Sequence, residues 1–187
     1  TIGMALASDA GVNDPEVSNA VELSARLLRF YAGKGAVPYG DHPAWMETHE
    51  DNGKCGMAAV LFTLLGESDK AEYFTRMAIA SHGAERDCGH TGNYFNMLWS
   101  MPAIALGGPN ATGAWTHEFG AWYHDLARSW DGSFTHQGPP EPEHDSYHGW
   151  DATGAYLLAY ALPLRKTALT GRVSSITPNL SSEQVQS

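Results

Sequence analysis

Three short stretches of this chain gather the side chains that could carry chemistry, and each stands directly before an apolar run. They read THEDNGK from residue 48, ERDCGHTGN from residue 85 and DSYHGWDATG from residue 145. If each apolar run is a helix, each stretch lies at a helix N-terminus, where free N–H groups and the helix dipole favour polar or anionic ligands. The sequence therefore predicts one shared pocket formed by residues 49–54, 85–94 and 144–151.

Carboxylates and aromatic rings in these stretches fit the chemistry of carbohydrate cleavage. Glycoside hydrolysis needs two carboxyl groups about 5 to 9.5 Å apart, and a lyase needs a Tyr or His as its base. The predicted catalytic residues are Asp51, Glu85, His90, Tyr94 and Asp151, with Glu50, Asp87 and Asp145 as further candidate carboxylates. The predicted binding residues are His49, Asn52, Lys54, Trp99, His148 and Trp150. A simpler interpretation stays open for each, because acids at helix starts commonly serve as caps and histidines are commonly satisfied by carbonyl groups.

The two cysteines, Cys55 and Cys88, stand at the starts of two of the apolar runs. Cys55, Cys88 and His90 are the predicted metal ligands, and His49 or His148 would complete a tetrahedral zinc set. The close Cys-x-x-Cys spacing of a strong zinc motif is missing, so a Cys55–Cys88 disulfide and two free thiols are the alternatives. The expectation is that the protein has no cofactor, with zinc as the alternative. The phosphate-binding glycine loop and the Gly-x-Ser-x-Gly motif are both absent from the sequence.

The apolar periodicity predicts helices of two kinds. Runs 53–65, 91–106 and 153–162 are apolar on every side, which is typical of helices buried all round. Runs 15–31, 68–81 and 112–130 are amphipathic. In the last of these, Trp115, Phe119, Trp122, Leu126 and Trp130 recur at intervals of three and four, so they are predicted to pack as one face. The polar, Gly- and Pro-rich segment 36–54 is predicted to be a functional loop.

The alternation of buried and amphipathic helices predicts an all-α fold. Thr-Gly followed by an aromatic residue recurs at positions 91, 112 and 153, which suggests a repeated helical hairpin. The predicted architecture is an α/α toroid, or a partial toroid, in which buried inner helices alternate with amphipathic outer ones. One domain is predicted over residues 1–172, followed by a flexible polar tail over 173–187.

The segments that carry a family resemblance read DNGKCGMAAVLFTLLG, AEYFTRMA, GHTGNYFNMLW, DLARSWDGSF and GWDATGAYLLAYALPLRKTALTG. In them the chain resembles a family of uncharacterised bacterial proteins, a domain of unknown function with a six-hairpin, terpenoid-cyclase-like α/α-toroid fold. The resemblance implies the fold and not the chemistry, because such toroids host glycosidases, lyases, cyclases, prenyltransferases and binding proteins. A full toroid is longer than this chain, so the resemblance also implies that the chain is the C-terminal part of a larger protein.

The net charge and the hydropathy of the chain limit the classes of partner that it can have. The chain has 187 residues and a formal net charge of −10, and it has no basic stripe, which argues against a nucleic-acid partner. Its longest apolar run, 57–65, is far shorter than the roughly 20 residues that span a bilayer. The expected function is a carbohydrate-active hydrolase or lyase acting on a glycan or small-molecule ligand. The alternatives are a non-catalytic binding or scaffold domain and a zinc-dependent toroid enzyme.

Overall fold

The computed structural model describes residues 1–40, 42–87, 93–137 and 149–164, together with residues 167, 181, 183 and 184. The helices over these residues are α1 (Ile2–Asp9), α2 (Pro15–Tyr31), α3 (Lys54–Leu64), α4 (Ser68–Ala80), α5 (Ala84–Asp87), α6 (Tyr94–Leu106), α7 (Pro109–Phe119) and α8 (Thr153–Ala161). A π-helical turn, Gly120–Asp125, continues α7, and a 3-10 turn, Leu162–Leu164, follows α8. Within the described ranges there is no strand, so the all-α prediction is confirmed.

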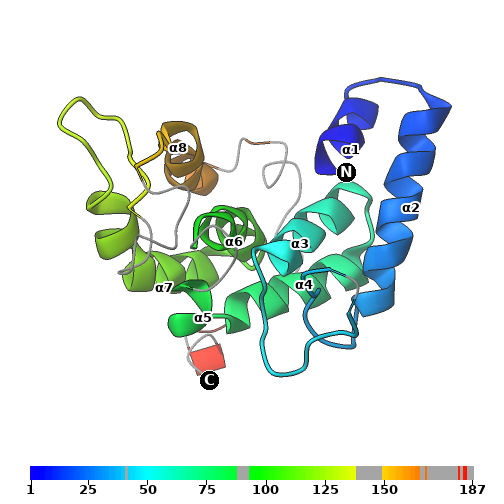
Figure 1. Ribbon diagram of the computed structural model, residues 1–187, viewed down its shortest axis with the longest axis horizontal. Coiled ribbons are helices and arrows are strands. Elements are labelled where there is room, and N and C mark those ends of the chain that lie inside the picture. The colour runs from blue at the N-terminus through cyan, green and yellow to red at the C-terminus, as the bar shows by residue number, and fades with distance from the viewer. Residues whose placement is uncertain are drawn as a thin grey trace.

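The helices form two rows that run side by side across the molecule (Figure 1). In one row α1 contacts α3, α3 contacts α6, and α6 contacts α8. In the other row α2 packs on α1 and α3, α4 packs on α3 and α6, and α7 packs on α6. Each helix of the second row follows its partner of the first row along the chain, so the rows are built from successive antiparallel hairpins.

Helices α3 and α6 lie side by side, run in the same direction and begin at the same end of the molecule. A Cβ atom on Gly53 would lie 2.3 Å from the carbonyl oxygen of Phe95, and one on Gly56 would lie 2.5 Å from that of Trp99. Only glycine leaves room for backbones to approach so closely. The parallel contact therefore depends on these two glycines, and it places the polar segments before α3 and α6 next to each other.

Replacing Gly56 by Ala is expected to lower the free energy of unfolding by about 1 to 3 kcal/mol, because the methyl group must displace the backbone of α6. Gly113 in α7 is the matched control, since a Cβ there meets no atom within 4 Å. Gly113→Ala is expected to raise stability by about 0.5 to 1 kcal/mol through helix propensity alone. Urea denaturation measures both, and a Gly56→Ala variant as stable as the wild type would contradict the contact.

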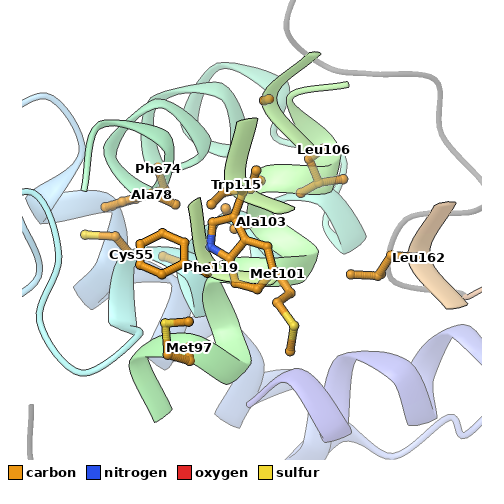
Figure 2. Packing of buried hydrophobic residues seen from close by; sticks show 14 of the residues in the cluster. Cys55, Phe74, Ala78, Met97, Met101, Ala103, Leu106, Trp115, Phe119 and Leu162 are labelled. Carbon is orange, nitrogen blue, oxygen red and sulfur yellow. The ribbon is translucent and has the colours of Figure 1, made fainter. Parts of the chain in front are cut away.

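One large apolar cluster lies between the rows. Figure 2 shows side chains from α3, α4, α6 and α7 gathered in it, with Phe119 of α7 and Met97 of α6 among them. Phe62 of α3 and Phe74 of α4 stack with ring centroids 5.8 Å apart. The buried positions of α3 and α6 spread round each helix rather than along one face, as the two apolar runs predict.

The prediction of a single packed face over residues 112–130 was wrong beyond Phe119. Trp115 and Phe119 are buried, but Leu126 is 71% exposed and Trp130 is 98% exposed. The helical structure ends with the π-helical turn at Asp125, so Leu126 and Trp130 lie outside the helix and share no face with Trp115 and Phe119. Tyr123 and His124 of the π-helical turn are buried instead.

Helix α8 is also less buried than its sequence predicts. Its residues Leu157 and Tyr160 are half exposed, and Tyr156 is the buried residue of the helix. Helix α8 stands at the end of its row and packs on α6 from one side. The prediction of a helix buried all round is therefore wrong for the face of α8 turned away from α6.

His124 makes the stability of the protein depend on pH. Burial lowers the pKa of its imidazole from 6.5 to about 4, although the charge of Asp125 opposes the shift. Above pH 6.5 the side chain is neutral in both folded and unfolded chains. As the pH falls from 6.5 towards 4, the unfolded chain takes up a proton that the folded chain does not. The contribution is therefore complete above pH 6.5 and is lost below it.

The loss from this group is expected to reach about 3 kcal/mol at pH 4. Denaturation curves between pH 7 and pH 4 measure it as the difference in slope between the wild type and His124→Phe, which has no proton to bind. His117→Phe, at an exposed site on the same helix, is measured alongside as the matched control. Equal slopes for wild type and His124→Phe would contradict the pKa shift.

Candidate functional site

Two of the three polar stretches meet at the common end of α3 and α6. The backbone N–H of His49 donates to Oε1 of Glu85 at 3.4 Å, and Nδ1 of His49 lies 3.3 Å from the same oxygen. His49 belongs to the loop before α3, and Glu85 belongs to α5 just ahead of α6. The structure therefore brings together a predicted binding residue and a predicted catalytic residue from segments 36 positions apart.

Glu50 caps the start of α3. Its carboxylate is 3% exposed and accepts hydrogen bonds from the N–H groups of Asp51 at 2.9 Å, Cys55 at 2.8 Å and Gly56 at 2.9 Å. Burial raises the pKa of Glu50, while the positive charge of Arg86 and the three N–H groups oppose the rise. The cap interpretation therefore describes Glu50, because its oxygens satisfy donors that a helix start leaves free.

Arg86 is a buried cation of α5 that joins this helix to the end of α4 and to α6. Its Nε donates to the carbonyl oxygen of Ser81 at 2.9 Å, and its Nη1 donates to Oδ1 of Asn96 at 2.7 Å. Its Nη2 donates to the carbonyl oxygen of Ala78. The guanidinium thus satisfies free carbonyl groups at the end of α4 and ties them to α6. Burial lowers the pKa of Arg86, and the negative charge of Glu50 is the largest opposing influence.

Three buried oxygen atoms around these helix starts have no hydrogen-bond partner among the described residues. They are Oδ1 of Asn52, Oε2 of Glu85 and Oδ1 of Asn93. Asn52 has a left-handed backbone, with φ at 58°, and the Nδ2 of Asn93 donates to Oδ1 of Asp87 at 3.3 Å. Each unpaired acceptor destabilises the fold by about 1 to 3 kcal/mol.

A cavity of about 780 Å³ adjoins the start of α3. Lys54 and Trp99, both predicted binding residues, line it together with apolar side chains of α1, α2 and α3. The Nζ of Lys54 donates to the carbonyl oxygen of Pro38 at 3.0 Å, lies 3.4 Å from Oδ2 of Asp51, and sits 4.1 Å from the ring centroid of Tyr39. Burial lowers the pKa of Lys54, and the charge of Asp51 opposes the shift. The cavity therefore combines apolar walls with the amine of Lys54.

The third stretch is described from Gly149 onward. Oδ1 of Asp151 accepts a hydrogen bond from the N–H of Thr153 at 2.9 Å, and its hydrogen bonds with Thr153 lower the pKa of Asp151. Asp151 is exposed, and its hydrogen bond with the first N–H of α8 makes it a cap of that helix. Trp150 is exposed as well, and its carbonyl oxygen accepts from the N–H of His136 at 2.9 Å.

Tyr94 links α6 to this third stretch. Its ring meets the ring of His136 edge to face, with centroids 5.1 Å apart, and His136 is buried beside the hydroxyl of Tyr156 at 3.4 Å. The sequence gives no signal for His136, since it stands alone in a loop. His144, Asp145 and His148 lie outside the described residues, as do Cys88 and His90.

Cys55 carries a free, fully buried thiol. Its Sγ accepts a hydrogen bond from the N–H of Val37 at 3.4 Å, and burial raises the pKa of the thiol well above its usual range. Figure 2 shows it among the apolar side chains of the core. A zinc ligand must be a thiolate, so these surroundings do not fit one. Within the described ranges no three His, Cys, Asp or Glu side chains are grouped to hold a metal. The zinc set remains a prediction that depends on Cys88 and His90.

None of the helices in the described part of the chain combines the length and the hydropathy that crossing a membrane requires.

Comparison with known families gives a match over most of the chain. The profile of a family described as a domain of unknown function, DUF6288, matches residues 1–171. Comparisons with curated proteins and with solved structures find no match. The family match therefore covers every described helix up to α8, and the description of the family names no activity.

Proposed function

The chain belongs to the DUF6288 family, and we propose that it is a carbohydrate-active hydrolase or lyase with its pocket at the common end of α3 and α6. The observation that carries the proposal is the carboxylate of Glu85. Its Oε1 lies against His49, while its Oε2 is buried and has no hydrogen-bond partner in the described part of the chain. A carboxylate held on one side and unpaired on the other is suited to exchange a proton with a bound substrate.

The surroundings of Glu85 suit a sugar. Sugar hydroxyl groups are donors, and the unpaired oxygens of Asn52, Asn93 and Glu85 are acceptors for such hydrogen bonds. Trp99 offers an aromatic wall in the adjoining cavity, and Lys54 offers a positive charge for the carboxylate of an acidic sugar. These groups account for binding without any metal or cofactor.

The same residues allow two reactions. In hydrolysis Glu85 protonates the leaving glycosidic oxygen as general acid, and Asp51 is the second carboxylate that activates water or attacks the sugar. In a lyase reaction Tyr94 or His90 removes the proton next to the carboxylate of the sugar as general base, and Glu85 protonates the leaving oxygen.

The arrangement of the helices supports a toroid as the finer description of the fold. Parallel α3 and α6 in one row, with α4 and α7 behind them, form consecutive hairpins of the kind that build an α/α toroid. Within the described residues the hairpins follow one another across the molecule, as neighbouring hairpins of a toroid would.

A second candidate function is a binding domain without catalysis. The caps formed by Glu50 and Asp151 favour it, because both carboxylates are committed to helix starts. In that case the unpaired oxygens would hold a glycan and no bond would break.

A panel of neutral and uronate-containing polysaccharides tests both candidates. Reducing ends report cleavage, and the ultraviolet absorbance of an unsaturated sugar separates a lyase from a hydrolase. We expect product from at least one polysaccharide. Binding without product on a glycan array would favour the second candidate, and neither binding nor product would overturn both.

A further inference from the structure

A second pocket lies between α6, the π-helical turn and the end of α8. It encloses about 270 Å³. Most of its lining is apolar or aromatic and includes Met101, Ile104, Trp115, Tyr160 and Leu162. None of these residues belongs to the pocket at the start of α3.

His124 is one of the polar residues that line this pocket. It lines the pocket, is 3% exposed, and neither of its ring nitrogens has a hydrogen-bond partner within the described chain. Rings surround it instead, with centroids 5.3 Å away for Trp115, 5.2 Å for Tyr156 and 5.8 Å for Tyr160. A buried imidazole normally has a hydrogen-bond donor or acceptor beside it. The imidazole of His124 has neither, and a bound ligand could supply the missing partner.

The charges around the pocket disfavour an anionic ligand. His124 is uncharged at neutral pH, because burial lowers its pKa to about 4. Asp125 also lines the pocket, and its Oδ1 accepts a hydrogen bond from the hydroxyl of Tyr160 at 3.2 Å. A negative carboxylate at the wall and no cation among the described lining residues disfavour an anion.

The volume limits the ligand to about one substituted ring. An apolar cavity of about 150 Å³ is enough to hold benzene, so this pocket has room for a ring with small substituents. Aromatic rings in the lining favour edge-to-face and offset contacts with another ring.

We propose that this pocket binds a small neutral aromatic alcohol of the phenol class, whose hydroxyl group donates a hydrogen bond to a ring nitrogen of His124. The π-helical turn is what creates the site, because it turns His124 inward in place of Trp122. Turns of this kind occur frequently at functional sites. The proposal does not depend on the function of the pocket at the start of α3.

Calorimetric titration of the full chain with p-cresol, toluene and 4-methylanisole tests the proposal. p-Cresol has the hydroxyl donor, whereas the other two have nearly the same shape and no donor. We expect p-cresol to bind about 10-fold more tightly than either, which is the effect of one hydrogen bond. Equal affinities, or no binding of p-cresol, would overturn the proposal.

Two variants place the effect at His124. His124→Phe should reduce the affinity for p-cresol to that for toluene, while His117→Phe should leave it unchanged. An unchanged affinity in a folded His124→Phe variant would overturn the assignment. Benzylamine binding more tightly than p-cresol would also overturn it, because the pocket would then select a cation through Asp125. If His124→Phe does not fold, the comparison of the three probes on the wild type still decides.

Discussion

Arg86→Met is expected to lower the free energy of unfolding by about 3 to 5 kcal/mol, the cost of removing one partner from a buried charged network. The substitution leaves the carbonyl groups of Ala78 and Ser81 and the side chain of Asn96 without their donor. It also leaves the buried carboxylate of Glu50 without the positive charge that opposes its desolvation. Methionine fills a similar volume, so the loss reports the charge and the hydrogen bonds rather than a cavity.

Arg76→Met is the matched control. Arg76 lies on the exposed side of α4 and pairs with Glu72 four residues earlier at 2.8 Å, so its loss should cost no more than about 0.5 kcal/mol. Adding Glu50→Gln to Arg86→Met should cost less than the sum of the two single changes, because the amide carries no charge to be left uncompensated. Arg86→Met with the stability of Arg76→Met, measured by urea denaturation, would show that the buried network does not hold the fold.

Glu85→Gln is expected to reduce turnover of the polysaccharide that the protein cleaves by about 100- to 10,000-fold, the usual contribution of a general acid or base. The amide keeps one oxygen to accept from His49 but cannot exchange a proton. Stability should stay close to that of the wild type, because Glu85 is partly exposed and its carboxylate contacts a single residue, His49, among the hydrogen bonds described.

Glu72→Gln on α4 is the control for this change, since it removes the same charge from an exposed site. It should alter neither turnover nor stability. Full turnover in Glu85→Gln would remove Glu85 from the reaction and leave the second candidate function, binding without catalysis. Loss of turnover together with loss of stability would instead assign Glu85 a structural role.

The helices were largely predictable from the sequence because their signals are local. Pro15 after the capping Asp14, the apolar run into α3 and the amphipathic repeat of α4 each depend on neighbours within a few residues. The short helix α1 carries no such signal, and the sequence analysis missed it. The π-helical turn also has no local signature, and neither has the end of the helix at Asp125, which leaves Leu126 and Trp130 outside it.

The contact between the first two polar stretches was predictable, and the roles of their side chains were not. Placing polar residues at helix starts correctly joined His49 with Glu85, because the starts of parallel neighbouring helices must meet. The sequence could not separate Glu50, which caps a helix, from Glu85, which has an unpaired oxygen. That difference depends on which backbone groups lie within reach after folding. The role of Arg86 was not predictable either, because an arginine between two acidic residues is expected to lie on the surface. Only the structure shows that it is buried.

The contacts at Gly53 and Gly56 have a consequence for how ligands are recognised. Close backbone contact at two points resists sliding of α3 along α6, so we expect the α3–α4 and α6–α7 hairpins to move together. We then expect the opening next to them to be preformed, with little conformational entropy lost when a molecule enters it. Selection among candidate ligands then depends on shape at first encounter, with little adjustment afterwards.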